Sequence, residues 1–346
     1  MKMLREANLA LGFAALLIFL SLFADFLSSN PPAMQNLDQF YHPPTNVRFF
    51  DADGKFNFSP FFYKTDLQEP LDVNYRENRD VAYPLEFFCK GYRYKLFGLI
   101  ALDRHLVGRS EAPYFYPLGT DELGRDVLAR VFAGAQTSLM VVAFGVVLYA
   151  VLGLVFGALA GTLGGWVDSL LMRFSEFVLA LPALYLLLAI RALLPPDIPF
   201  WQTLFIMVGT IAAVTWPPMA RGTRGLILQL KNSSYVEAAR SLGGTRIHIF
   251  LRHMFPSLLP FVLSQLAVAA PIFLLGELVL SFLNVGFGDS GESWGSMLRS
   301  LKDTRVITDF WWNLLPLGMI FLTLLSLNIL TGQLRKKIPQ DRVMRF

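Results

Sequence analysis

The feature that most constrains this chain is a set of six apolar windows. Each is long enough to cross the roughly 30 Å hydrocarbon core of a bilayer as a helix of about 20 residues. Backbone polar groups in lipid must be paired within their own segment, and the windows are too long for barrel strands, so we expect helices. They lie at roughly 8–27, 136–162, 174–194, 201–220, 257–283 and 312–332. The sequence predicts an all-α polytopic membrane protein with six transmembrane helices.

The composition supports this fold class and excludes others. Of 346 residues, 54% are apolar and only 16% are charged, and the charges concentrate between the windows. The net charge of +4 comes with no basic run that alternates with aromatic residues, so we expect no nucleic-acid partner. The single cysteine, Cys89, excludes an internal disulfide and a metal cage of thiolates.

Orientation follows from the Lys and Arg residues of short loops, which favour the cytoplasmic side. The first window could be a signal peptide, but no small-residue cleavage site follows it, so we expect an uncleaved anchor. Basic side chains dominate the loop 221–256 and the C-terminal tail: Arg221, Arg224, Lys231, Arg240, Arg246 and Arg252, then Arg335, Lys336, Lys337, Arg342 and Arg345. We therefore expect both termini in the cytoplasm of a multi-pass inner-membrane protein.

The predicted organisation has three parts. Residues 1–27 form the first transmembrane helix, and 118–346 form a domain with the other five. Residues 28–117 mix aromatic side chains, prolines and balanced charges. Disorder would need fewer aromatic residues and a larger net charge, so this range is expected to be a small folded extracytoplasmic insert.

The most informative segment is the loop 231–256. Ser234 and Glu237 have the spacing of a capping box, which predicts a helix start. Its apolar face would hold Tyr235, Ala238, Ala239 and Leu242. Gly243 and Gly244 should end this helix, and Thr245 should cap a second short helix that ends before Pro256. Small residues on an exposed apolar face allow close approach, which is typical of a docking element.

This loop resembles the signature of the permease subunits of binding-protein-dependent ABC importers, which have the type I importer fold. The matching residues are Glu237-Ala238-Ala239, Gly243 and Pro256, while His253 and Phe255 replace the usual Ile and Leu. The resemblance implies that the segment is a coupling loop that binds an ATP-hydrolysing subunit. It implies as partners a second, homologous permease subunit, two ATP-binding subunits and an extracytoplasmic solute-binding protein.

Other motifs are similar to those of the dipeptide and oligopeptide permease branch. They are Pro117–Arg130, Met172-Arg173 with Glu176 and Pro182, Trp216 with Ala220-Arg221 and Arg224, and Glu277 through Ser281-Phe282-Leu283. The resemblance runs from about residue 117 onward and includes the first span. The insert 28–117 is similar in extent to that of the extended peptide permeases of the microcin-uptake type. The implied function is translocation of peptides or similar small solutes across the inner membrane.

Three further patterns concern packing and charge. Gly119–Asp126 has the glycine spacing of a phosphate loop, but Arg125-Asp126 replaces the required Lys-Ser/Thr. We expect instead a helix start, with Thr120 as the N-cap of an amphipathic helix at the outer interface. Gly153, Gly157 and Gly161 predict a close helix interface. Glu277 is the only acid well inside a span, where it either makes a structural hydrogen bond or contacts the solute.

No enzyme motif is present in the sequence, and no catalytic, cofactor-binding or metal-binding residue is predicted. His248 and His253 are five residues apart, a poor metal spacing on a helix. The alternative is a channel or an ion-coupled secondary transporter, but that class favours inverted repeats or several intramembrane charges. An intramembrane enzyme would need catalytic groups, and a membrane anchor that presents the insert is the least specific reading. The sequence does not identify the solute.

Overall fold

The computed structural model describes residues 2–50, 55–69, 72–96, 99–109, 111–193, 195, 198–288 and 291–337. The chain divides into two compact units. The helical unit contains 1–14, 140–280 and 323–346, and the mixed unit contains 15–139 and 281–322. Four helices have a part in each unit: α1 (Lys2–Leu22), α3 (Val127–Leu163), α10 (Phe255–Phe282) and α13 (Leu315–Lys337). Residues 338–346, which include the predicted basic tail from Arg342 on, lie outside the described part of the chain.

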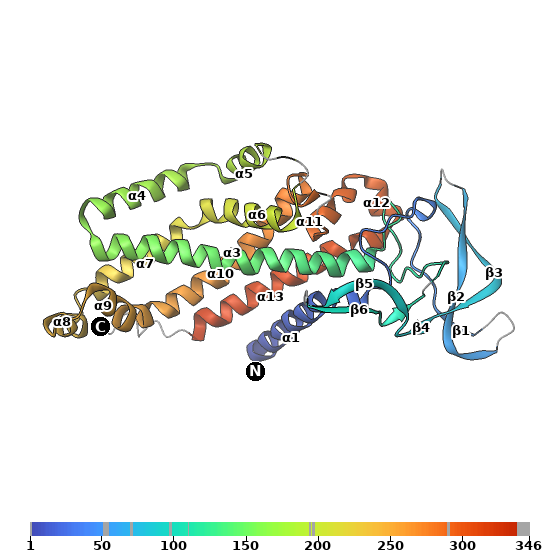
Figure 1. Ribbon diagram of the computed structural model, residues 1–346, viewed down its shortest axis with the longest axis horizontal. Helices are drawn as coiled ribbons and strands as arrows, with labels where there is room; N and C mark the ends of the chain where they lie inside the picture. The colour runs from blue at the N-terminus through green and yellow to red at the C-terminus, as the bar shows by residue number, and fades with distance from the viewer. Residues whose placement is uncertain are drawn as a thin grey trace. The chain divides into compact units, whose positions relative to one another are not determined.

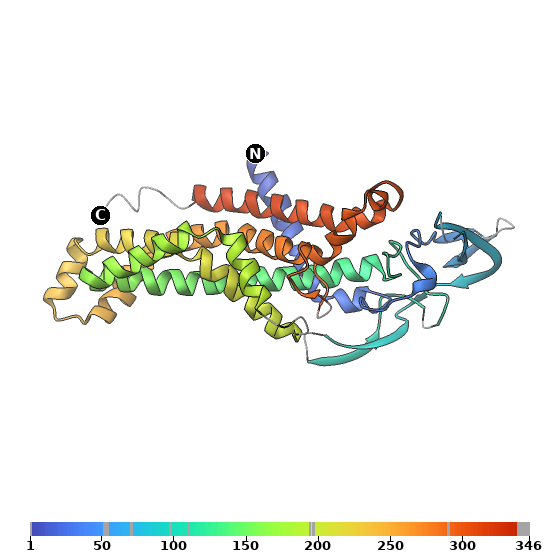
Figure 2. The same ribbon diagram turned by 90° about the horizontal axis from the view of Figure 1, so that it is seen from above.

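The described chain is mostly helical (Figures 1 and 2). Three continuous helices are long and apolar enough to span a membrane: Val127–Leu163, Arg246–Phe282 and Trp311–Leu334. A fourth candidate is a pair, α6 (Phe200–Thr215) and α7 (Pro217–Leu230), bent by 50° at Trp216. The bend has a direct cause, since Pro217 and Pro218 lack the N–H groups that a straight helix requires there. Asn8–Leu22 is a shorter apolar helix.

The predicted window 174–194 differs from a single straight span. It falls on two helices, α4 (Gly165–Ala180) and α5 (Ala183–Ala192). Leu181 between them is extended, with φ −74° and ψ 132°. The residue before a proline is pushed out of the helical region by the proline ring, so Pro182 explains the break.

Helix α3 packs closely on α7 through the three predicted glycines. A Cβ atom at Gly153 would lie 2.1 Å from Met219 Cγ, and one at Gly157 would lie 2.6 Å from the backbone oxygen of Ala220. A Cβ at Gly161 would lie 2.8 Å from Ile227 Cβ. The prediction of a close helix interface is therefore confirmed, because only a residue without a side chain fits at these positions.

Helix α4 joins the same group of helices by an ion pair and by aromatic contacts. Asp168 accepts two hydrogen bonds from the Arg224 guanidinium of α7, at 3.0 and 2.6 Å. The Trp216 ring lies 4.7 Å from Phe156 of α3 and 6.0 Å from Phe174 of α4, measured between ring centroids. Three helices therefore meet around one tryptophan.

The described residues also form strands, in contrast to the predicted all-α fold, and these strands lie between residues 48 and 108 of the mixed unit. One antiparallel sheet has the order β1-β2-β3, and two further pairs are β4-β7 and β5-β6. Their bounds are Arg48–Phe50, Phe56–Glu69, Asn74–Pro84, Glu86–Phe87, Lys90–Leu96, Ile100–Arg104 and Val107–Gly108 for β1 to β7. Phe62, Leu85 and Phe115 form a buried cluster beneath this part of the chain. The described residues of 28–117 therefore include strands and a buried cluster, while the assignment of this range as a separate extracytoplasmic insert stays a prediction.

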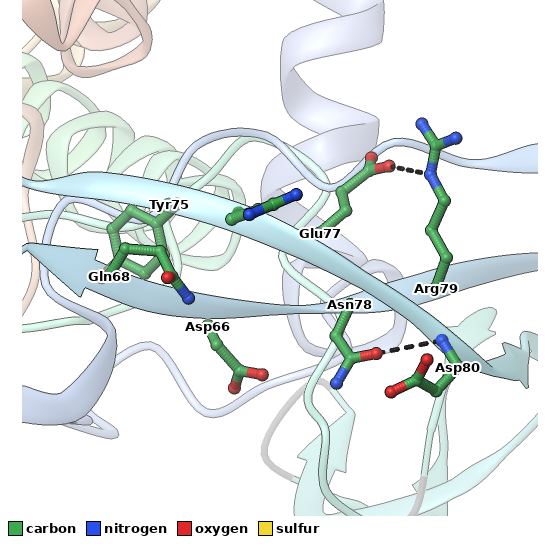
Figure 3. A pocket seen from close by; sticks show the side chains of 8 residues that line it. Asp66, Gln68, Tyr75, Glu77, Asn78, Arg79 and Asp80 are labelled. Carbon is green, nitrogen blue, oxygen red and sulfur yellow. Dashed lines mark hydrogen bonds and ion pairs between the residues drawn. The ribbon is translucent and has the colours of Figure 1, made fainter.

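The edge strand β3 carries charged side chains that discourage pairing with another strand. With β2 it lines an open cavity of about 730 Å³, drawn in Figure 3. Glu77 accepts from Arg48 at 2.8 Å and lies 3.5 Å from Arg79, while Asn78 Oδ1 accepts from the Asp80 N–H at 2.9 Å. Acids and bases alternate here and partly neutralise one another.

The glycine interface gives a testable prediction. Gly157→Ala should lower the melting temperature of the purified chain in detergent, because overpacking a close contact costs about 1–3 kcal/mol. Gly225→Ala in α7 is the matched control, since nothing lies within 4 Å of a Cβ added there. Alanine favours a helix by up to about 1 kcal/mol over glycine, so the control should be neutral or stabilising. Equal melting temperatures for the two variants would contradict the α3–α7 contact.

Candidate functional site

The loop 231–256 begins with α8, Ser234–Ser241. Its N-cap is Ser233, whose hydroxyl donates to Leu230 O at 2.6 Å instead of accepting from the helix. The predicted capping box at Ser234 is therefore wrong: Ser234 is already helical, and the Glu237 N–H donates to the Ser233 carbonyl at 3.0 Å. The Ser233 hydroxyl donates to the preceding helix because α8 follows α7 after only three residues, which keeps the Leu230 carbonyl within hydrogen-bond distance. The carboxylate of Glu237 is in the first turn of α8, where the helix dipole favours negative charge.

A glycine corner ends α8, as predicted. Gly243 has φ +84°, a left-handed backbone conformation that residues with a Cβ atom rarely adopt. The Gly244 N–H donates to Ala239 O at 3.1 Å and so satisfies a carbonyl at the helix end. Thr245 then caps α9 (Arg246–Ile249), since its hydroxyl accepts from the His248 N–H at 3.3 Å.

The second helix does not end before Pro256, in contrast to the prediction. A π turn (Phe250–Met254) joins α9 directly to α10, and Pro256 is the second residue of α10. The π turn shifts the backbone hydrogen bonds by one residue just ahead of the proline, which has no N–H and would clash with the carbonyl of a regular preceding turn. Residues 246–282 therefore form one continuous helix, and α9 is mechanically part of a candidate span.

An open groove of about 370 Å³ lies across the corner. Its lining combines the apolar face predicted for α8 with a glycine and the two histidines: Tyr235, Ala238, Ala239, Leu242, Gly244, His248 and His253. Leu242 is 89% exposed and Ile247 is 73% exposed. In Figures 1 and 2, α8 and α9 lie at one end of the helical unit, beyond the ends of α3 and α7. The arrangement exposes apolar and small side chains at a free end, which suits contact with another protein.

The histidines of the groove contact each other. The rings of His248 and His253 are 5.9 Å apart between centroids, in an edge-on arrangement. The π turn brings two positions five residues apart onto one side, which a regular helix would not do. Among the described residues, no group of three or more His, Cys, Asp or Glu side chains is placed to hold a metal ion.

The loop is anchored to the helices by its opposite side. Val236, Ile249 and Met254 are buried. The Lys231 ammonium donates to the carbonyls of Gly161 and Thr162 at the end of α3, at 3.2 and 3.0 Å. Cations stabilise the negative end of a helix, so Lys231 joins the start of the loop to α3. A displacement of α8 would therefore act on α3 and, through α9, on α10.

Glu277 lies in α10 and is fully buried within this chain. Its neighbour Gly276 approaches α6, since a Cβ there would lie 3.1 Å from Ile211 Cδ1. The carboxyl group is thus enclosed between helices and is not on a free surface. Its assignment to the solute pathway or to a helix contact stays a prediction.

A buried charge network that the sequence reading missed lies at the start of α3. Arg130 contacts Asp121 by one guanidinium nitrogen and Glu292 by another, the latter at 2.7 Å. Arg125 contacts the same two acids, at 2.8 Å for Asp121 and 3.5 Å for Glu292. The network joins the turn before α3 to the segment after α10. The sequence signal was the charge in 117–130, which was interpreted as a family motif and a helix start and not as an ion-pair network.

Asp126, not Thr120, is the N-cap of α3, so the predicted amphipathic interface helix is wrong. Asp126 Oδ1 accepts from the N–H groups of Leu128 and Ala129, at 2.9 and 3.3 Å. Thr120 instead donates its hydroxyl to Gln39 O at 2.5 Å, which holds the segment in a turn. Burial raises the pKa of Asp126 to about 6. The amide of Asn30 and the two backbone donors oppose that shift.

Comparisons with known proteins identify the family of the chain. Residues 153–340 match a family described as a binding-protein-dependent transport system inner membrane component. The oligopeptide transport system permease protein OppC of Haemophilus influenzae is 33% identical over 229 residues, which cover 66% of this chain and 71% of that protein. The dipeptide transport system permease protein DppC of Bacillus subtilis is 33% identical over 213 residues, covering 61% and 64%. A putative peptide permease protein of Brucella suis biovar 1 is 32% identical over 235 residues, covering 67% and 76%.

The charge network predicts a strong dependence on Arg130. Arg130→Gln should lower the melting temperature by several degrees, because it leaves the two acids Asp121 and Glu292 with Arg125 as their one cation in the network, and breaking a buried ion pair costs about 3–5 kcal/mol. Arg305→Gln is the control: it breaks the exposed Arg305–Asp309 pair, which should contribute at most about 1 kcal/mol. Thermal unfolding in detergent measures both. If the two substitutions have the same effect, the network is not a stabilising element.

Proposed function

The chain belongs to the family of binding-protein-dependent transport system inner membrane components, and from this premise we propose that it is one of two permease subunits of an ATP-driven peptide importer. The groove on the loop 231–256 carries the proposal, because it combines exposed apolar side chains with a rigid connection to α3 and α10. The names of the similar proteins support peptides as the solute class.

The proposed assembly contains this chain, a second homologous permease, two ATP-binding subunits and an extracytoplasmic solute-binding protein. ATP hydrolysis belongs to the ATP-binding subunits, and this chain forms and breaks no covalent bonds. Its loop 231–256, the coupling loop, binds one of those subunits by Tyr235, Glu237, Ala238 and Ala239. The side chains of Leu242 and Ile247 add exposed apolar area to that contact.

Coupling uses the anchors of the loop. Closure of the ATP-binding pair displaces α8, and the Gly243 corner passes this displacement to α9 without unfolding either short helix. Because α9 continues into α10, and Lys231 joins the loop to α3, the displacement reaches two candidate spans. The pathway then switches between outward and inward access. Glu277 lies on α10 along this route, either as a helix contact or at the solute pathway.

The proposed topology has six spans with both termini in the cytoplasm. The broken segments α4–α5 and α6–α7 each count as one span in this scheme. The coupling loop is then cytoplasmic, and the insert 28–117 is extracytoplasmic. The excess of basic residues in 221–256 supports this orientation.

The docking role predicts a selective loss of partner binding. Leu242→Gln should abolish co-purification of the ATP-binding subunit, because it puts a polar group into the apolar contact. Leu99→Gln is the matched control, because Leu99 is 85% exposed and lies on the insert. Neither substitution should change the melting temperature of the chain alone. Retention of the ATP-binding subunit by Leu242→Gln would exclude the groove as its binding site.

The coupling role predicts uptake loss without loss of insertion. Gly243→Val forces a branched side chain into the left-handed conformation, which costs about 1–2 kcal/mol or more, and should distort the corner. Peptide uptake into proteoliposomes bearing the complex should fall at least about tenfold, while the ATP-binding subunits still hydrolyse ATP. Glu237→Lys should act in the same direction.

A control separates backbone strain from coupling. Gly164 also has a positive φ of +68° with nothing near its Cβ position, but lies between α3 and α4. Gly164→Val should keep more than about half of the uptake. Normal uptake by Gly243→Val would defeat the mechanism. Uptake of labelled sugars or nickel chelates in place of peptides would leave the mechanism intact and change the substrate class.

A further inference from the structure

A second cavity lies beside the coupling loop, distinct from the docking groove. It has a volume of about 490 Å³ and shares only Gly244 with the groove. Its lining comes from the end of α3, the residue after α7, and the α8–α9 corner. Three of the lining side chains are cations, Lys231, Arg240 and Arg246, and none of the described lining residues is acidic.

These cations are available to an anion to different degrees. The Lys231 ammonium donates to the carbonyls of Gly161 and Thr162, and its third N–H can donate to an anion. Arg240 and Arg246 are exposed. Within the described parts of the chain neither guanidinium is in an ion pair. The cavity is therefore a concave site with uncompensated positive charge.

Apart from Thr162 and Gly244, the remaining lining residues are apolar, and the cavity lies at the ends of two candidate membrane helices. Leu163, Ile249 and Met254 supply this surface. Leu163 is the last residue of α3, and Lys231 follows the last residue of α7, so the cavity lies at the end that these two helices share. Trp166, three residues after Leu163, is 75% exposed, and tryptophan is typical of membrane interfaces. A charged cavity with an apolar wall fits a phosphate that carries a glycerol and acyl chains.

We propose that this cavity binds the phosphate group of an anionic phospholipid. Arg240 and Arg246 hold the phosphate oxygens, for which planar guanidinium groups are well suited, and Lys231 adds charge. The glycerol region lies against Leu163. A lipid bound in this way joins the end of α3 to the α8–α9 corner, so it would stabilise the position of the coupling loop. The site is independent of the identity of the transported solute.

An anion in this cavity could also come from the cytosol, or from an acidic segment of a partner protein. A free inorganic phosphate would satisfy the cations but leave the apolar wall uncovered. Leu242, the exposed apolar C-cap residue of α8, lines the other groove, so we expect a protein partner to bind on that side. The lipid accounts for both halves of the lining.

The test is native mass spectrometry of the full-length chain in detergent. The chain is titrated with phosphatidylglycerol or with phosphatidylcholine of the same acyl chains. Near a membrane surface each basic residue adds about fivefold to the affinity for anionic lipid. Arg240→Gln with Arg246→Gln should therefore weaken phosphatidylglycerol binding about 30-fold and leave phosphatidylcholine binding unchanged. Arg221→Gln with Arg252→Gln is the matched control, since it removes the same charge from α7 and the coupling loop at positions outside the cavity, and it should keep the preference.

Each result decides the proposal. Equal affinity of the unmodified chain for the two lipids, or an equal loss in both double variants, would overturn it. Loss of the preference when inorganic phosphate is added would assign the site to free phosphate. Release of phosphatidylglycerol when the ATP-binding subunit joins the complex would assign it to a protein contact. Retention in the assembled complex, with a loss only in the cavity variant, supports the lipid.

Discussion

The rest of the structure depends on one requirement, which is that a backbone in hydrocarbon must satisfy its own polar groups. This requirement makes each candidate span a helix and leaves side-chain chemistry for the helix ends. The Arg130 network and the coupling loop both occur where helices begin or end. Prolines mark two of the interruptions: Pro182 lies between α4 and α5, and Pro217 begins α7 directly after the bend that follows α6. The functional surfaces are therefore built from caps, corners and end charges.

The glycine stripe of α3 gives the coupling loop its support. Gly153, Gly157 and Gly161 bring α7 so close to α3 that the residue after α7, Lys231, reaches the last carbonyls of α3. The loop is thereby fixed at its start by α3 and at its end by α10. A loop fixed at both ends transmits a displacement where a flexible one would absorb it. This rigidity separates a coupling element from a surface loop that happens to be apolar.

Much of the helical part could be predicted from the sequence, because the length of an apolar segment and the spacing of its glycines depend only on residues that are close together in the chain. The windows that became the three continuous candidate spans, the α3–α7 contact, the Gly243 corner and the Thr245 cap are of this kind. The wrong predictions concern positions where two nearby residues could each cap the same helix. Ser233 rather than Ser234 takes the N-cap, and Asp126 rather than Thr120 caps α3. The Glu292–Arg130 contact joins residues 162 positions apart, which no local pattern reveals. The π turn before Pro256 was missed because it is an adjustment to a proline inside a continuous helix.

The most direct test of the account is the accessibility of the coupling loop. A cysteine introduced by Leu242→Cys, with the buried Cys89 changed to serine, can be labelled with a membrane-impermeant maleimide. We predict labelling in inverted membrane vesicles but not in intact spheroplasts, and protection when the ATP-binding subunits are present. Labelling from the outside, or labelling that the assembled complex does not reduce, would contradict the claim that this loop is the cytoplasmic contact of the permease with its ATP-binding partner.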